Sequence, residues 1–427
     1  MPTTPTRART LWRDADFRRL WIGQTASQLG EHTTLVVLPL FAVLTLHTDA
    51  GQLGVLRAVG QAPILLLSLF AGAWVDRWRT RTTMVRTDAA RALLLGGAAV
   101  AALLGRLGPA ALLVLAFAVG TLSVFFDVAY QTSLVRLVRR DQLVRGNSAL
   151  EGSRSAAQIG GPALGGAAVS LLTAPVATAS TAVFFALSFL SIRRIRTDAE
   201  SLPERGEPED RSRTRVLRRI REGLRFVAGH TALRTVCLAS AAFQFSYAAL
   251  ITVHLLFLTR ELHLSGTLVG LVLAAGGPGA LLGSLLAARL PGRFGHGPVL
   301  VGAAVLGDGA YLCVPALHGS AAPTVTVLLT VGFVFGCGGQ VVNVTVMAVR
   351  QSVTPDALQG RTAATITFVG MGLAPPGSLT GGLLAREWGL RTSLLVTAAA
   401  MLLSPVVMAL SPLARLGRDL PATARPA

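Results

Sequence analysis

Long apolar segments alternate along this chain with short polar segments that are rich in arginine. A helix that crosses the hydrocarbon core of a membrane needs about 20 mostly apolar residues. Twelve segments meet this requirement, in two groups of six on either side of a polar stretch near the middle. They are Leu20 to Leu46, Gly51 to Val75, Met84 to Leu104, Pro109 to Val135, Ser148 to Leu172, Pro175 to Ile192, Leu233 to Thr259, Thr267 to Leu290, Pro298 to Leu317, Pro323 to Val349, Thr362 to Leu384 and Thr392 to Leu410. The pattern predicts an all-α membrane protein with twelve transmembrane helices.

The two groups predict two six-helix bundles, residues 20–192 and residues 232–411. Residues 1–19 and 412–427 are predicted to be cytoplasmic tails, and residues 193–231 a cytoplasmic linker. The halves also resemble each other in sequence, because "RDQLVRGNSA" precedes the fifth segment and "PDALQGRTAA" precedes the eleventh. Such internal repeats are typical of transporters in which one half moves against the other.

The second part of the linker has apolar residues at helical spacing with arginines between them. These apolar residues are Val216, Leu217, Ile220, Leu224 and Val227. The spacing predicts an amphipathic helix on the inner membrane surface. A tether that orients the two halves is the favoured interpretation, and docking to anionic lipid or to a partner is the alternative.

Composition and charge narrow the class of protein. Of 427 residues, 52% are hydrophobic and only 14% charged, and the mean hydropathy of +0.58 excludes an ordinary water-soluble enzyme. All 39 basic residues are arginine, and the net charge of +18 raises the question of nucleic acid. If the amino terminus is cytoplasmic, however, only five arginines fall on the outer side and the other 34 on the inner side. The five are Arg57, Arg106, Arg260, Arg386 and Arg391.

This distribution follows the positive-inside rule. The basic excess is therefore interpreted as a signal of topology and not of nucleic-acid binding. Both termini are predicted to be cytoplasmic in a multi-pass protein of the plasma membrane.

The sequence contains no signature of catalysis. It has no GxSxG, P-loop, dinucleotide-binding or HExxH pattern. Cys237, Cys313 and Cys337 lie in apolar segments without metal-ligand spacing, so packed thiols are expected. Neither an enzyme nor a cofactor or metal site is predicted, and uphill transport would have to draw on an ion gradient.

Ionisable residues inside predicted spans are costly and usually face a water-filled cavity. Glu31 lies nearest the middle of the membrane and is the first candidate for carrying protons, with Asp127 second. At a rise of about 1.5 Å per residue, Arg154 reaches a depth similar to that of Asp127 and is a candidate cationic partner. A purely structural pair of Arg154 with Asp127 or with Glu151, joining helices 4 and 5, is the equal alternative.

The stretch "GAWVDRWRTR" between the second and third segments predicts a tight cytoplasmic loop. Asp88 and Arg91 follow on one face of the third segment. We expect these residues to form an inner gate whose salt bridges close the cytoplasmic side. The residues assigned to this gate are Gly72, Asp76, Arg77, Arg81, Asp88 and Arg91.

Polar residues are sparse in the second half. Gln244, Tyr247, Gln340 and Asn343 interrupt long apolar runs and are candidates for contacting a substrate in a central cavity. Hydrogen bonds between helices are the alternative interpretation.

Helix 5 contains the run "GGPALGG". Gly161, Gly165 and Gly166 permit close approach of a neighbouring helix, and Pro162 weakens the local hydrogen-bond ladder. A helix 5 of the exporter type and a generic packing seam are both compatible with this pattern.

Several of these stretches together resemble the major facilitator superfamily. "GAWVDRWRTR" is similar to the superfamily's loop between helices 2 and 3, and Gly161 to Gly166 to the end of the motif that marks its antiporters. With "FRRLWIGQTASQLGEHTTLVVLPL" and Phe125 to Gly166, the chain resembles the macrolide-efflux and enterobactin-exporter-like branch. The resemblance implies two pseudo-symmetric six-helix bundles, alternating access driven by proton antiport, and a monomer.

The leading hypothesis is therefore a secondary transporter that exports an amphipathic small molecule, such as an antibiotic or a siderophore, in exchange for protons. Its partners would be the substrate, protons and membrane lipids. An importer or uniporter of a small nutrient, and a lipid-handling membrane protein, are the alternatives.

Overall fold

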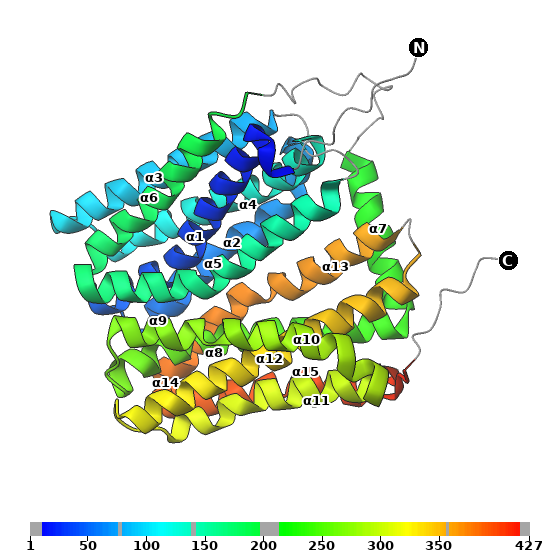
Figure 1. Ribbon diagram of the computed structural model, residues 1–427. Helices are drawn as coiled ribbons and strands as arrows, with labels where there is room; N and C mark the ends of the chain where they lie inside the picture. The colour runs from blue at the N-terminus through cyan, green and yellow to red at the C-terminus, as the bar shows by residue number, and fades with distance from the viewer. Residues whose placement is uncertain (1–10, 76–78, 138–141, 197–212, 356–357, 419–427) are drawn as a thin grey trace, which may run out of the picture.

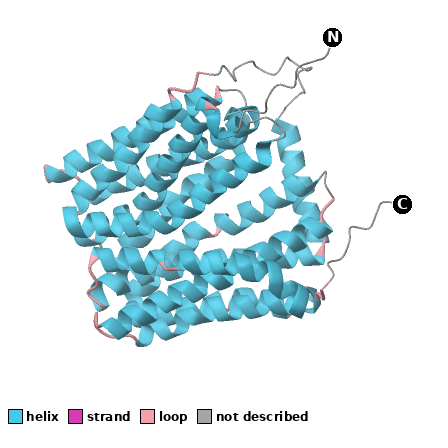
Figure 2. Ribbon diagram, viewed as in Figure 1, coloured by secondary structure: helices cyan, strands magenta, loops and turns pink. Residues whose placement is uncertain are grey.

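The computed structural model describes residues 11–75, 79–137, 142–196, 213–355 and 358–418. Throughout these residues the regular secondary structure is helical (Figure 2). The first bundle lies at the top of Figure 1. It consists of α1 (Ala15–Leu44), α2 (Ala50–Val75), α3 (Thr80–Leu103), α4 (Pro109–Leu137), α5 (Leu143–Leu172) and α6 (Ala174–Ile192).

The second bundle lies below the first in the same view. It consists of α8 (Thr231–Leu256), α9 (Gly266–Ala274), α10 (Gly276–Phe294), α11 (His296–Gly309), α12 (Ala322–Val353), α13 (Gln359–Gly372), α14 (Ala374–Met401) and α15 (Leu403–Ala409). Short turns of other helix types extend α8 over Phe257–Glu261 and α11 over Ala310–Ala316.

The predicted spans and the observed helices agree in number. In the part of the chain that the structure describes, nine helical stretches are long and apolar enough to cross a membrane, and the stretch Arg361–Ala409 contains two of the predicted spans. Helices α3 and α5 complete the twelve; they carry charged residues, among them Arg91 and Arg154. The expected twelve transmembrane helices in two bundles are confirmed.

Three spans that the sequence predicted as continuous are broken, and one of them is the twelfth, which changes from α14 to α15 at Leu402. The eighth span changes from α9 to α10 at Ala275, just before Pro278, and the eleventh changes from α13 to α14 at Leu373, before Pro375 and Pro376. Proline has no backbone N–H to donate to the helical ladder, so a break at these positions costs few hydrogen bonds. Helix α14 then turns at Gly389, whose φ of 75° is left-handed, and continues into the twelfth span.

The linker helix α7 (Arg213–Gly229) belongs physically to the second bundle. Arg361 of α13 donates a hydrogen bond to Glu222 over 2.7 Å. A Cβ at Gly223 would lie 2.7 Å from the hydroxyl of Thr365, and Val227 joins the buried apolar cluster of that bundle. The linker helix is therefore packed as part of the second bundle.

The two ends of the helices differ in how tightly the bundles are joined. We call the end where α1 begins and α15 ends the terminal face, and the opposite end the distal face (Figure 1). Near the distal face, α2 packs against α14 and α5 packs against α9. A Cβ at Gly54 would lie 2.7 Å from the carbonyl oxygen of Ser378 and 3.0 Å from Gly382. The backbones approach this closely only because small residues line both sides.

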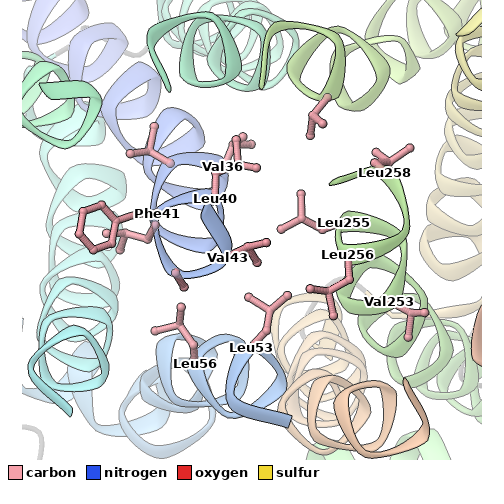
Figure 3. Close-up of a cluster of buried hydrophobic side chains, with 14 of the residues drawn as sticks. Val36, Leu40, Phe41, Val43, Leu53, Leu56, Val253, Leu255, Leu256 and Leu258 are labelled. Atoms are coloured by element: carbon pink, nitrogen blue, oxygen red, sulfur yellow. The ribbon is translucent and has the colours of Figure 1, made fainter. Parts of the chain in front are cut away.

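An apolar cluster fills the space between these helix pairs, and Figure 3 shows the side chains that form it. We call it the distal cluster. It brings together Val36, Leu40 and Val43 of α1, Leu53 and Leu56 of α2, and Val253, Leu255, Leu256 and Leu258 from α8 and the turn that extends it. Beside it, the guanidinium of Arg260 in the second bundle donates a hydrogen bond to the carbonyl of Thr48 in the first. The distal face is thus closed by apolar contacts that belong to both bundles.

Toward the terminal face each bundle has an apolar cluster of its own. One cluster contains Phe17, Phe126 and Ile192 and stays within the first bundle, and another contains Leu233 and Val349 and stays within the second bundle and α7. The helices of the two bundles spread apart in this direction (Figure 1). The structure is closed at the distal face and parted at the terminal face.

The contact between α5 and α9 yields a testable prediction. A Cβ at Gly166 would strike the carbonyl of Gly266 and the backbone of Gly270, and overpacking of this kind costs about 1–3 kcal/mol. We expect Gly166→Leu to lower the thermal unfolding midpoint of the purified protein and to part the distal face. Gly160→Leu is the matched control, because a Cβ there meets nothing within 4 Å. Equal midpoints for the two variants would contradict the close packing described above.

Candidate functional site

A polar cavity of about 540 Å³ lies among helices α1, α4 and α5 of the first bundle. We call it the first-bundle cavity. Its lining residues recur at intervals of three or four positions on each helix, so each helix presents one polar stripe to it. The lining comprises Gln24, Gln28, Glu31, His32, Asp127, Tyr130, Gln131, Asn147, Leu150, Glu151 and Arg154.

The cavity brings together the three residues that the sequence singled out for proton coupling. Glu31, Asp127 and Arg154 come from three different helices and all line it. The sequence analysis missed the amide and phenol groups beside them, although Gln24, Gln28 and Gln131 stand at helical spacing from the chosen acids. Their helical spacing from Glu31 and Asp127 could have identified these glutamines as cavity residues from the sequence.

The charges in this cavity are only loosely paired. The Glu31 side chain is 27% exposed, and its Oε2 atom accepts no hydrogen bond. Arg154 lies 3.9 Å from Glu151, and both side chains are more than half exposed. Asp127 makes no ion pair with Arg154 among the described residues, so the pairing seen here is the one within α5.

Arg91 and Asp88 do not lie where the gate hypothesis placed them. Both are fully buried inside the first bundle, where they form an ion pair with each other. The gate hypothesis predicts that they meet the loop arginines at the cytoplasmic end. Their helix is instead rotated so that these two side chains point into the bundle, because a paired buried charge is tolerated there and an unpaired one facing lipid is not.

Arg91 makes polar contacts through both terminal nitrogens, whereas its Nε atom has no hydrogen-bond partner among the described residues. Its Nη2 atom donates to the hydroxyl of Ser27 over 3.0 Å, and its Nη1 atom donates to the hydroxyl of Ser123 over 3.1 Å. The guanidinium carbon lies 4.6 Å from the ring centre of Phe126 and 4.4 Å from that of Phe185, within range of cation–π attraction. The Nη1 atom is also 3.9 Å from Oε2 of Glu31. Arg91 thus links the buried Asp88 to the acid of the first-bundle cavity.

The remaining gate candidates are only partly described. Gly72 lies in the last turn of α2, whereas Asp76 and Arg77 lie outside the described residues. Arg81 donates a hydrogen bond to the carbonyl of Arg193 over 2.7 Å. This contact joins the start of α3 to the end of α6, and both helices belong to the first bundle. Arg81 therefore does not bridge the two bundles.

The glycines of α5 allow close contact with two neighbouring helices, α1 and α9. A Cβ at Gly161 would lie 2.5 Å from Cβ of His32 in α1, and one at Gly165 would lie 3.1 Å from the carbonyl of Thr33. Gly166 faces α9 of the other bundle, and the carbonyl of Pro162 lies 2.6 Å from the position of a Cβ at Gly270. Helix α5 is therefore packed tightly against its own bundle on one face and against the opposite bundle on another.

The four polar candidates of the second half separate into two cavities. Tyr247 and Gln340 line a cavity of about 290 Å³ between α5 and the second bundle. Gln244 and Asn343 line another, of about 340 Å³, inside the second bundle. The ring of Tyr247 stacks 5.4 Å from that of Phe335, which makes the wall between the bundles aromatic.

No thiol or metal cluster accompanies these cavities among the described residues. The three cysteines are free. Cys237 is buried, as expected for a packed thiol, but Cys313 is exposed, because its position on the turn after α11 faces away from the bundle interior.

Comparisons with known proteins agree with this architecture. A family model described as transmembrane secretion effector (MFS_3) matches residues 8–425. The multidrug efflux pump Tap of Mycolicibacterium fortuitum is 29% identical over 391 residues, which cover 90% of this chain and 92% of that protein. The uncharacterized MFS-type transporter YfiS of Bacillus subtilis is 24% identical over 397 residues, 90% of each chain.

Solved structures of transporters share the fold. The nucleoside transporter NupG superposes with a TM-score of 0.74 at 12% identity and covers 92% of this chain and 98% of its own. A bacterial homologue of the iron transporter ferroportin, in an inward-facing state, gives 0.72 at 18% identity, with 94% and 98% covered. At these identities the likeness concerns the fold alone. The chain belongs to the transmembrane secretion effector family of the major facilitator superfamily, whose members are membrane transporters and not enzymes.

Proposed function

We propose that this protein is a secondary active transporter that exports an amphipathic small molecule by proton antiport. The efflux function is supported by the family and by the relatives named as multidrug efflux pumps. The proton coupling rests on one observation, the convergence of Glu31, Asp127 and Arg154 on one cavity of the first bundle. Carboxylates within a membrane protein that face a polar cavity are suited to exchanging protons.

The division of the apolar clusters supports alternating access. The distal cluster joins both bundles, whereas the clusters near the terminal face stay within one bundle each. Two such bodies can rock about their contacts without disrupting their own cores. Opening the distal face would require the distal cluster to part and the hydrogen bond from Arg260 to Thr48 to break.

Arg91 gives the first-bundle cavity a means of sensing the charge on Glu31. When Glu31 is ionised it attracts Arg91 across 3.9 Å, in competition with Asp88. A proton on Glu31 removes that attraction and leaves Arg91 to Asp88. Arg91 also donates hydrogen bonds to Ser27 on α1 and Ser123 on α4. A shift of Arg91 between Glu31 and Asp88 would therefore alter the packing of α1 against α4.

We place the terminal face in the cytoplasm of a cell with this protein in its plasma membrane. The support is the distribution of arginine, because five of the 39 arginines belong to the distal half of the spans or to distal loops. The parted side of the structure would then take up substrate from the cytoplasm, as an exporter requires.

The orientation can be tested by labelling cysteines on whole cells. In a variant without the native thiols, Ser320→Cys places a thiol at the exposed distal connection before α12, and Ala228→Cys places one on α7. We expect a membrane-impermeant maleimide to label Ser320→Cys on intact cells and Ala228→Cys only after permeabilisation. The reverse pattern would overturn the orientation.

Proton coupling can be tested in proteoliposomes with a substrate found by screening a deletion strain for drug hypersensitivity. We expect Glu31→Gln and Asp127→Asn each to reduce transport driven by a pH gradient by roughly tenfold or more. Glu387→Gln is the control, because this acid is 68% exposed and lies next to Arg386. If both cavity variants retain gradient-driven transport, the proposed mechanism is wrong.

The position of Arg91 predicts a stability effect. Arg91→Met leaves Asp88 buried without its cation, which should lower the free energy of unfolding by about 3–5 kcal/mol. The double variant Asp88→Asn with Arg91→Met should recover part of that loss, measured by thermal unfolding in detergent. Arg293→Met, at an exposed position of α10, should change little. A double variant as unstable as Arg91→Met alone would contradict the pairing.

A further inference from the structure

The cavity inside the second bundle contains a charged group that the proposed mechanism does not use. Asp308 near the end of α11 lines it together with Gln244 of α8 and Asn343 of α12. We call this space the Asp308 cavity. Its volume of about 340 Å³ is within the range of pockets that hold drug-sized molecules, roughly 300–1,000 Å³.

Asp308 differs from every other deeply buried acid in the described part of the chain. Three aspartates there are less than one-tenth exposed: Asp16, Asp88 and Asp308. Asp16 pairs with Arg19, and Asp88 pairs with Arg91. Asp308, at 5% exposure, makes no hydrogen bond or ion pair with any described residue. An ionised carboxylate without a counter-charge is costly to bury, so a cation that entered the cavity would be attracted to Asp308.

The backbone directs Asp308 into this space. Helices α11 and α12 approach closely where a Cβ at Gly338 would lie 2.5 Å from the carbonyl of Ala303 and 3.0 Å from Gly307. The next residue, Gly339, lines the cavity, and a Cβ there would meet nothing within 4 Å. The space beside Gly339 in the Asp308 cavity is therefore open and is not filled by side chains.

The other charged lining residue is too distant to serve as the counter-ion. Arg350 lies three residues before the terminal end of α12, whereas Asp308 lies twelve residues from the terminal start of α11. At about 1.5 Å per residue, these positions differ in depth by roughly 13 Å. No ion pair joins Arg350 and Asp308. A cationic ligand would supply a counter-charge that the described residues do not.

The rest of the lining fits an amine attached to an apolar body. Side-chain oxygens of Gln244 and Asn343 can accept hydrogen bonds from an ammonium group, and the ring of Phe243 offers a further surface for a cation. Val342, Val346, Ile366, Met371 and Met408 supply apolar walls. A small inorganic ion would leave most of these walls unused.

We propose that the Asp308 cavity binds the ammonium group of an amphipathic organic amine, with the carboxylate of Asp308 as its counter-ion. This inference rests on the proposed export function and names a substrate class for it. It also separates two tasks between the bundles: protons are exchanged in the first-bundle cavity, and the charge of the substrate is recognised in the second bundle.

The site can be tested by fluorescence titration of the purified protein, without any gradient. The probe is dansylcadaverine, a dansyl group on a pentylammonium chain, and its comparison is N-hexyl dansylamide, in which a methyl replaces the ammonium. We expect the wild type to bind the ammonium probe more tightly than its neutral counterpart. Asp308→Asn should weaken the ammonium probe by at least about tenfold and leave the neutral compound unchanged.

A second variant leaves Asp308 in place and fills the cavity. Gly339→Leu should weaken both probes, because its side chain enters the open space beside Asp308. Gly302→Leu is its control, since Gly302 is an exposed position of α11 with nothing within 4 Å of a Cβ. This pair keeps the proposal testable if Asp308→Asn fails to fold.

Two results would overturn the inference. One is equal affinity of wild type and Asp308→Asn for the ammonium probe. The other is a loss of affinity in Glu31→Gln or Asp127→Asn but not in Asp308→Asn, which would place the cation in the first-bundle cavity. If the probe binds in an Asp308-dependent way but no pH gradient moves it, the inference stands and the proposed proton antiport fails.

Discussion

The apolar contact between the two bundles near the distal face is the constraint on which the rest of this structure depends. Val36, Leu40, Leu53 and Leu256 share one buried cluster across the bundle boundary, and apolar burial is worth about 25 cal/mol per Å² removed from water. Among the residues that the structure describes, no buried apolar cluster joins the bundles at the terminal face, where each body has its own cluster. Because of this asymmetry the structure is closed at the distal face and parted at the terminal face.

The distribution of buried charge follows from the same constraint. A side chain can take up a proton or bind a ligand only where it is not already enclosed by packed neighbours. Groups with such a role are therefore expected on cavity walls. Glu31 and Asp308 illustrate this in different bundles: the Oε2 atom of Glu31 accepts no hydrogen bond, Asp308 makes no ion pair with a described residue, and each residue lines a cavity. Asp88 illustrates a different case, because one of its oxygens pairs with the guanidinium of Arg91 inside the bundle, although its other oxygen has no hydrogen-bond partner in the described part of the chain. The proposed division between proton exchange and substrate recognition follows from this placement.

Sequence reasoning predicted the number and order of the spans, because each needs a long apolar run. It also predicted from the rise per residue that Asp127 and Arg154 lie at a similar depth, and both line one cavity with Glu31, which was chosen as the acid nearest the middle of the membrane. Depth alone does not determine the rotation of a helix, which is why Asp88 and Arg91 were assigned to a gate although they point into the bundle. The sequence also does not determine which cavity a polar side chain lines. Gln244 and Tyr247 are three residues apart on α8 and yet line different cavities.

The central claim is that closure of the distal face alternates with closure of the terminal face. Spin-label distances measured across the bundles test it most directly, with one pair at the distal positions Thr45 and Ala321 and another at the terminal positions Arg145 and Gln351, all exposed. The account predicts opposite changes when pH and substrate are varied, so that the distal distance lengthens as the terminal distance shortens. Distances that change in the same direction, or a distal distance that never lengthens, would contradict it.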